Sequence, residues 1–266
     1  MEIFGYIAFV LMGLTLGLIG GGGSILTVPI LVYLFAIDPI LATAYSLFIV
    51  GLTALVGGFF YYKKGEVNLK TGLIFAVPSF VGVYLTRAYI VPRMPNPIFI
   101  IADFVISKPL LIMLIFAGLM LLASFSMIIE KKINKKPKER STICKVTLII
   151  AEGLIVGAIT GLVGAGGGFL IIPALVILVG LPMKIAVGTS LFIIAVKSLL
   201  GFIGDVQHQA YIDWTLLYTL AGIAILGLFF GMSLAKKVPE KILKKGFGYF
   251  VLMMGAFVLI DQLKKL

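Results

Sequence analysis

Two glycine runs inside long apolar segments are the residues of this sequence best suited to hold a small ligand. They are Gly20–Gly23 and Gly164–Gly168, the second interrupted by Ala165. Glycine lets backbone amides approach a ligand closely. A helix that restarts after such a break presents free N–H groups and a positive dipole end, which favour an anion. The two runs therefore predict an anion site.

Lys197 is the charged residue most suited to work with them, because it lies near the centre of the apolar run 193–200. A lysine at the bilayer centre costs about 2.5–3.5 kcal/mol on insertion scales. It should therefore face protein or a wet cavity, where it would attract an anion. The structural alternative is an ion pair with Glu152, which is also a weak candidate for proton coupling.

Hydroxyl side chains near the two glycine runs complete the candidate site. Ser24 stands where the helix should restart, and serine is a favoured N-cap residue. The hydroxyls could coordinate an oxyanion or bond to carbonyls of their own helices, and the glycines could simply permit close helix packing. The candidate substrate-binding residues are Gly20, Gly21, Gly22, Gly23, Ser24, Thr27, Ser46, Gly164, Gly166, Gly167, Gly168, Thr189, Ser190 and Lys197.

Composition places these residues in a membrane. Of 266 residues, 61% are hydrophobic and only 12% are charged, against about 45–50% and about 25% in soluble domains. So little polar surface excludes a soluble enzyme, a disordered chain and a nucleic-acid binder. The net charge of +11 is better explained by basic loops that stay on the cytoplasmic side.

The apolar segments form two copies of one pattern. Residues 17–29 align with residues 161–173 at a fixed offset, and the Ser-Leu-Phe-Ile block at Ser46 recurs at Ser190. The two segments that contain the glycine runs exceed 30 residues, so we interpret each as helix, break and helix. The predicted organisation is a first transmembrane repeat at 1–133, a basic linker at 134–144 and a second repeat at 145–266.

The distribution of charge predicts how the two repeats are oriented. If each broken segment is a hairpin that returns to its own side, 16 of the 22 Lys and Arg residues fall on one face, as expected for the cytoplasmic side. A hairpin plus three spans gives an odd number of crossings. The predicted fold is an all-α polytopic membrane protein with two inverted-topology repeats, which is typical of secondary transporters. The basic loops that we expect in the cytoplasm include 63–70, 131–145 and 236–245.

The remaining polar residues indicate no catalytic centre. Asp205 and His208 are expected in a short loop opposite the basic face, where a solvated histidine is favoured over a proton relay. Arg87 and Arg93 are interpreted as anchors near the membrane surface. The sequence has neither a His/Cys cluster suited to a metal nor a serine nucleophile with a visible base, so we expect no enzyme, metal or cofactor.

The duplicated Gly-Leu-x-Gly-x-Gly-Gly-Gly…Pro element and the later Ser-Leu-Phe block resemble the TauE/SafE sulfite exporter family, also called the 4-toluene sulfonate uptake permease family. The resemblance covers essentially the whole chain. The two copies of the motif differ at two positions: the first has Ser24 where the second has Gly168, and the second has Ala165 where the first has a glycine. An insertion at about Met94–Lys108 also lengthens the last connection of the first half. The resemblance implies transport of sulfur-containing anions such as sulfite, sulfoacetate or other organosulfonates.

The sequence therefore predicts a secondary transporter of a small anion that works by alternating access between inverted repeats. Its expected partners are the anion, the lipid bilayer and a coupling ion, either a proton or sodium, and nucleic acid is excluded. The alternatives are an ion channel or metal-ion permease, and a membrane scaffold without transport activity.

Overall fold

The computed structural model describes residues 2–101, 104–129, 142–207, 212–235 and 240–264. Within them, seven helices are long and apolar enough to cross a membrane. The elements of the first half are α1 (Glu2–Ile19), η1 (Gly21–Leu26), α2 (Thr27–Tyr33), α3 (Pro39–Lys63), α4 (Leu69–Leu85), η2 (Thr86–Ile90), α5 (Val91–Arg93), β1 (Phe99–Ile101), β2 (Phe104–Ile106) and α6 (Lys108–Ile128). Those of the second are α7 (Thr142–Val163), α8 (Gly168–Ala174), η3 (Leu175–Val179), α9 (Met183–Val206), α10 (Trp214–Leu234) and α11 (Glu240–Leu263). The predicted helical membrane class is confirmed.

Both glycine runs break a helix, but they do so differently. In the first, Gly20 has a φ of 74° and is followed by the six-residue 3-10 helix η1. In the second, Gly164, Gly166 and Gly167 all have positive φ, and α8 begins at Gly168. Such φ values are cheap only for glycine, so the runs end α1 and α7 where they do.

The expected capping role of Ser24 is wrong. Ser24 lies within η1, and α2 begins after Leu26 without any side-chain cap. Because of the six-residue 3-10 turn, the N-cap position of the α-helix is Leu26, two residues after Ser24. The helices that restart, α2 and α8, have seven residues each and belong to longer helical segments, because α2 directly follows η1 and α8 continues into η3.

The principal helix pairs join the two halves of the chain. Helix α1 packs along α10, α4 along α7, α3 against α9 and α6 against α11. Backbones meet directly at glycines in two of these pairs. A side chain on Gly13 would overlap the backbone of Ala224, and one on Gly157 would overlap that of Ser79. The flanking glycines thus act in helix packing, which small residues favour in membranes.

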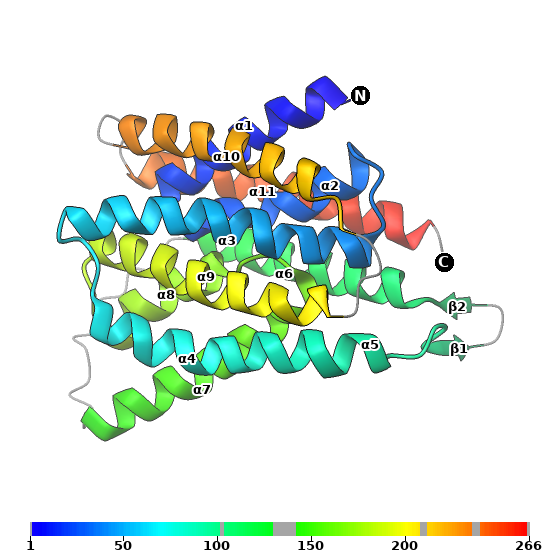
Figure 1. Cartoon of the computed structure of the whole chain (residues 1–266), viewed down its shortest axis with the longest axis horizontal. Helices are drawn as coiled ribbons and strands as arrows, with labels where there is room; N and C mark the ends of the chain where they lie inside the picture. The colour runs from blue at the N-terminus through cyan, green and yellow to red at the C-terminus, as the bar shows by residue number, and fades with distance from the viewer. Residues whose placement is uncertain (1, 102–103, 130–141, 208–211, 236–239, 265–266) are drawn as a thin grey trace.

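The contacts between helices also give their directions. In the α3–α9 pair, Gly51 lies against Leu199 and Gly58 against Phe192, so these two helices are antiparallel. In the α6–α11 pair, Gly248 lies against Ile128. Figure 1 shows that α6 and α11 also run in opposite directions, and that the α3–α4 connection lies at the end opposite to β1 and β2.

The inserted segment Met94–Lys108 contains structure that the sequence did not predict. Two three-residue strands, β1 and β2, pair antiparallel, with Phe99 opposite Ile106. The Asn96 side-chain oxygen accepts a hydrogen bond from the Lys108 amide at 3.2 Å. This is the one pair of strands among the described residues.

The α4–α7 contact predicts the effect of a single methyl group. Gly157→Ala places a Cβ on the Ser79 carbonyl, and overpacking costs about 1–3 kcal/mol. Gly118→Ala on α6 is the matched control, because its Cβ would meet nothing within 4 Å. Thermal unfolding in detergent should show a lower melting temperature for Gly157→Ala only. Equal melting temperatures would contradict this account of the α4–α7 contact.

The helix directions predict the sidedness of two matching positions. Lys63 ends α3 and Gln207 follows α9, and both are exposed. Introduced singly into a Cys144→Ser background, Lys63→Cys and Gln207→Cys should react with a membrane-impermeant thiol reagent from opposite sides of the membrane. Labelling of both cysteines from one side would contradict the arrangement of the two halves.

Candidate functional site

The two breaks meet at the centre of the molecule. A Cβ on Gly21 would overlap the Cα atom of Gly168, and one on Gly168 would overlap Gly21. The Ile194 side chain closes the same point, 2.5 Å from the Cβ position of Gly21. Even a methyl group has no room here, so both positions require glycine for packing. In this structure the breaks are in contact, and the predicted cavity between them would require them to separate.

Two of the candidate hydroxyls hold the second break in place. The Ser46 hydroxyl donates to the Gly164 carbonyl at 2.7 Å. The Ser24 hydroxyl lies 2.6 Å from the Ala165 carbonyl and 2.7 Å from that of Gly21, so it can donate to either. Carbonyls of irregular backbone at membrane depth need such partners. Ser24 and Ser46, both from the first half, therefore satisfy the backbone of the second.

Lys197 is fully buried, with 0% exposure. Its ammonium donates to the Thr160 hydroxyl at 2.7 Å, and the Thr160 hydroxyl lies 3.2 Å from the Gly157 carbonyl. Gly167 lies against both side chains, because a Cβ there would overlap the Thr160 Cγ2 atom and lie 2.9 Å from Lys197 Nζ. Within the described residues, no carboxylate lies within ion-pair distance of this ammonium, so the alternative pairing with Glu152 is absent.

Thr160 is the member of this group that the sequence analysis missed. It lies in α7, one turn before the second break, and it is 1% exposed. The residue that matches it in the first repeat is the apolar Leu16, so comparison of the two repeats does not mark this position as part of a polar site. Only the packing of α7 against the second break and α9 reveals its contact with Lys197.

The other candidates are dispersed around this centre. Ser190 donates to the carbonyl of Val187 at 2.8 Å, and Thr189 accepts the Asn68 amide at 2.9 Å. Thr27 Oγ1 is buried without a hydrogen-bond partner in the described part of the chain. Cβ positions on Gly22 and Gly23 would meet α1, the first against Ile19 and the second against Thr15 and Leu16. The closest grouping around the ammonium is therefore Lys197, Thr160 and Gly167.

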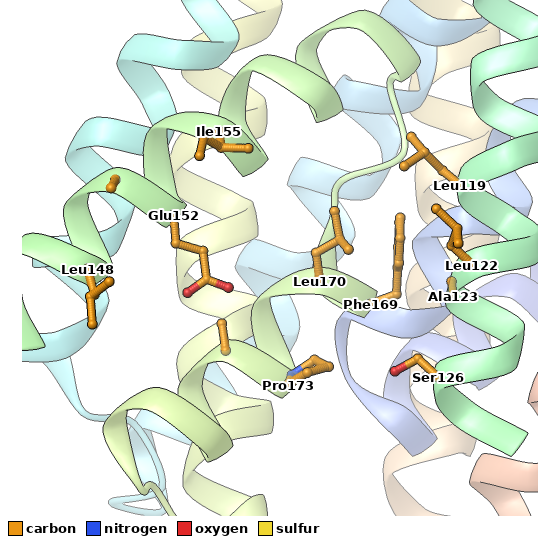
Figure 2. Close-up of a pocket in the computed structure, with 12 residues that line it drawn as sticks. Leu119, Leu122, Ala123, Ser126, Leu148, Glu152, Ile155, Phe169, Leu170 and Pro173 are labelled. Atoms are coloured by element: carbon orange, nitrogen blue, oxygen red, sulfur yellow. The ribbon is translucent and has the colours of Figure 1, made fainter. Parts of the chain in front are cut away.

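A cavity of about 570 Å³ lies beside the second break, between α6, α7 and α8. Phe169 and Leu170, which directly follow the break, form one wall. Glu152 points into this cavity from α7 (Figure 2), and its Oε2 is buried with no hydrogen-bond partner among the described residues. The cavity is otherwise mostly apolar.

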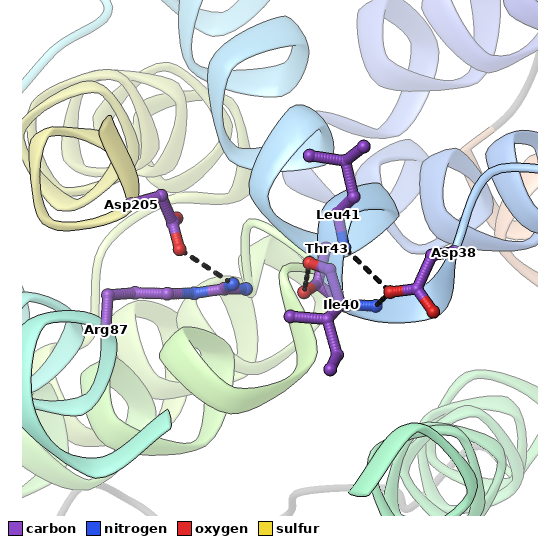
Figure 3. A network of polar contacts seen from close by, with 6 residues as sticks. All are labelled: Asp38, Ile40, Leu41, Thr43, Arg87 and Asp205. Atoms are coloured by element: carbon purple, nitrogen blue, oxygen red, sulfur yellow. Dashed lines mark hydrogen bonds and ion pairs between the residues drawn. The ribbon is translucent and has the colours of Figure 1, made fainter. Parts of the chain in front are cut away.

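Arg87 and Asp205 form a buried ion pair, which contradicts both sequence expectations. Arg87 Nη1 lies 3.2 Å from Asp205 Oδ1, and the two residues are 1% and 4% exposed (Figure 3). Arg87 lies within the helical segment that continues through η2, and α9 extends past Asp205 to Val206. The two helices pack closely at Gly204, whose Cβ would lie 3.2 Å from that of Arg87. Burial of both charges together is what makes each tolerable.

Two other polar predictions from the same region have different outcomes. Arg93 is exposed and lies over the Tyr89 ring at 5.1 Å, as an anchor at a membrane surface would. His208, which was expected in a solvated loop, lies outside the described residues.

Comparisons with known proteins agree with this architecture. The model of the family described as "Sulfite exporter TauE/SafE" matches residues 6–258. A probable membrane transporter protein of Xylella fastidiosa (strain 9a5c) is 28% identical over 94% of this chain and 91% of its own length. The probable membrane transporter protein YunE of Bacillus subtilis (strain 168) is 31% identical, over 90% of each chain. No solved structure matches. With its duplicated glycine breaks and nearly complete coverage by the family model, the chain belongs to the TauE/SafE sulfite exporter family and is a multi-pass membrane transporter protein.

Proposed function

We propose that this protein is a secondary transporter of a small oxyanion, sulfite or an organosulfonate, with Lys197 as the binding charge. One observation carries the proposal: a fully buried ammonium whose hydrogen-bond acceptor is a neutral threonine hydroxyl. A buried charge without a counter-ion is costly, and an anion would supply that counter-ion. The family and its relatives support transport, and the sulfur chemistry comes from the family description.

Lys197 and Thr160 have chemistry that suits an oxyanion. An ammonium offers three N–H donors, and Thr160 uses one of them in this structure. The hydroxyl of Thr160 can rotate to donate to an anion oxygen in turn. Gly167 brings the backbone of the second break against Nζ, and a Cβ at this position would lie only 2.9 Å from Nζ. We therefore place the anion against Nζ on the side of Gly167, where separation of the two breaks would admit it.

We further propose that access alternates by movement of two inverted repeats. The antiparallel course of α3 and α9, which occupy matching places in the two repeats, supports this arrangement. The contact between Gly21 and Gly168 would open and close as the halves move. Either a proton or sodium would couple this movement to an ion gradient. Glu152, whose carboxylate faces the cavity next to α8, is the residue that we propose for the proton.

Replacement of Lys197 tests the proposal directly. Lys197→Met is expected to lower the affinity for sulfite about 10–100-fold, because a hydrogen bond to a charged group contributes about 1.5–3 kcal/mol. Lys184→Met, an exposed lysine at the start of the same helix, is the matched control. Sulfite and methanesulfonate uptake into proteoliposomes, with counterflow, measures the effect and separates a carrier from a channel. Flux that is unchanged in Lys197→Met would remove this residue from the mechanism.

Replacement of Thr160 tests the contact that holds the ammonium. Thr160→Val keeps the shape but leaves Nζ without its acceptor, which should cost about 1–3 kcal/mol and lower the melting temperature of the anion-free protein. Thr53→Val is the control, since its hydroxyl donates only to the Ile49 carbonyl of its own helix. Saturating sulfite should narrow the difference between Thr160→Val and the wild type. A Thr160→Val protein as stable as Thr53→Val would argue against this contact.

A further inference from the structure

Arg87 has more hydrogen-bonding capacity than its surroundings use. Of its three nitrogens, Nη1 donates to Asp205 Oδ1 at 3.2 Å. Nε and Nη2 are buried without a hydrogen-bond partner among the described residues. The guanidinium is thus held from one side by an ion pair, while the two remaining nitrogens lie unused in the interior.

The unused nitrogens form one continuous edge of the guanidinium. In arginine the Nε–H and the neighbouring Nη–H bonds are parallel, and this edge matches two oxygens of one carboxylate, sulfonate or phosphate group. Leaving such donors buried and unsatisfied costs free energy. Such groups in a native protein call for an explanation, and a functional role of the donors is one.

The guanidinium also lies close to the candidate site. Figure 3 shows it extending from η2, which continues α4, in the direction of Ile40 and Thr43 near the start of α3. Thr43 packs in turn on the second break, because a Cβ on Gly164 would lie 2.6 Å from the Thr43 Cα atom. Asp205 follows Lys197 by eight residues on α9, which is about 12 Å along a helix. Arg87 therefore lies between Lys197 and the end of the molecule that carries Gln207.

The carboxylates near this edge are already engaged. Asp205 is paired with Nη1. Asp38 caps α3, where its Oδ1 accepts the amides of Ile40 and Leu41 at 2.9 and 3.4 Å. Neither residue occupies the Nε/Nη2 edge in this structure.

We propose that Arg87 forms a second oxyanion-binding position, between Lys197 and the end that carries Gln207. An incoming or departing sulfite or sulfonate accepts hydrogen bonds from Nε and Nη2 when this end of the molecule opens toward Arg87. Asp205 orients the guanidinium, and its negative charge weakens the binding of the anion to the guanidinium. This inference rests on the proposed function, since it takes the substrate to be an oxyanion.

Transport measured separately from each side of the membrane tests this position. Arg87→Lys keeps the charge but removes the bidentate edge. With sulfite and methanesulfonate as probes, it is expected to raise KM about tenfold on the side where Gln207 is labelled, while KM on the other side stays within twofold. Arg93→Lys, an exposed arginine on the same helical segment, is the control. An equal change on both sides, or no change, would overturn the proposal.

A second variant tests the oxyanion-binding position at Arg87 if Arg87→Lys does not fold. Asp205→Asn keeps the guanidinium and removes the competing negative charge, so KM on the Gln207 side should fall. A purely structural pair predicts the opposite, a loss of transport on both sides, and that result would overturn the proposal. The wild type and Lys197→Met serve as references. Absence of sulfite and sulfonate transport by the wild type refutes the proposed function itself, whereas Lys197-dependent transport with a symmetric effect of Arg87→Lys refutes only the second position.

Discussion

Direct contact between two backbone breaks, Gly21 against Gly168, is the constraint around which this molecule is built. Irregular backbone at membrane depth is tolerated only where protein or water satisfies its polar groups. Here the hydroxyls of Ser24 and Ser46 reach across from the first half to the carbonyls of the second break. The break is therefore stable only when both halves are assembled, and its glycines serve close approach as well as chain reversal.

Buried charge is handled in two different ways. Arg87 is balanced by a carboxylate, Asp205, on the neighbouring helix. Lys197 is balanced by no side chain among the described residues and meets only the Thr160 hydroxyl. The pair joins η2 to α9, which belong to different halves. The solitary ammonium leaves a local excess of positive charge, and this difference is the physical basis for assigning binding to Lys197.

The helices that pack most extensively on one another come from different halves of the chain. Helix α1 has its most extensive packing with α10, and α7 with α4. Helices α1 and α7, which precede the two breaks, are thus packed on the opposite half through backbone contacts at glycine. The two sequence repeats are therefore interlocked in this structure and do not pack as two separate bodies.

Local sequence properties determined the membrane class, the positions of the breaks and the burial of Lys197, because apolar runs, consecutive glycines and a charge inside a span act on the chain wherever it folds. Predictions from local sequence pattern were wrong for three polar residues. Ser24 has the right type for an N-cap, yet the 3-10 turn η1 places it against Ala165 instead. Arg87 and Asp205 were assigned to the membrane surface and a loop, although each is buried against the other. Thr160 beside Lys197 and the cavity at Glu152 were decided only by the tertiary structure, because they depend on which faces of distant helices meet, and no spacing along the chain encodes that.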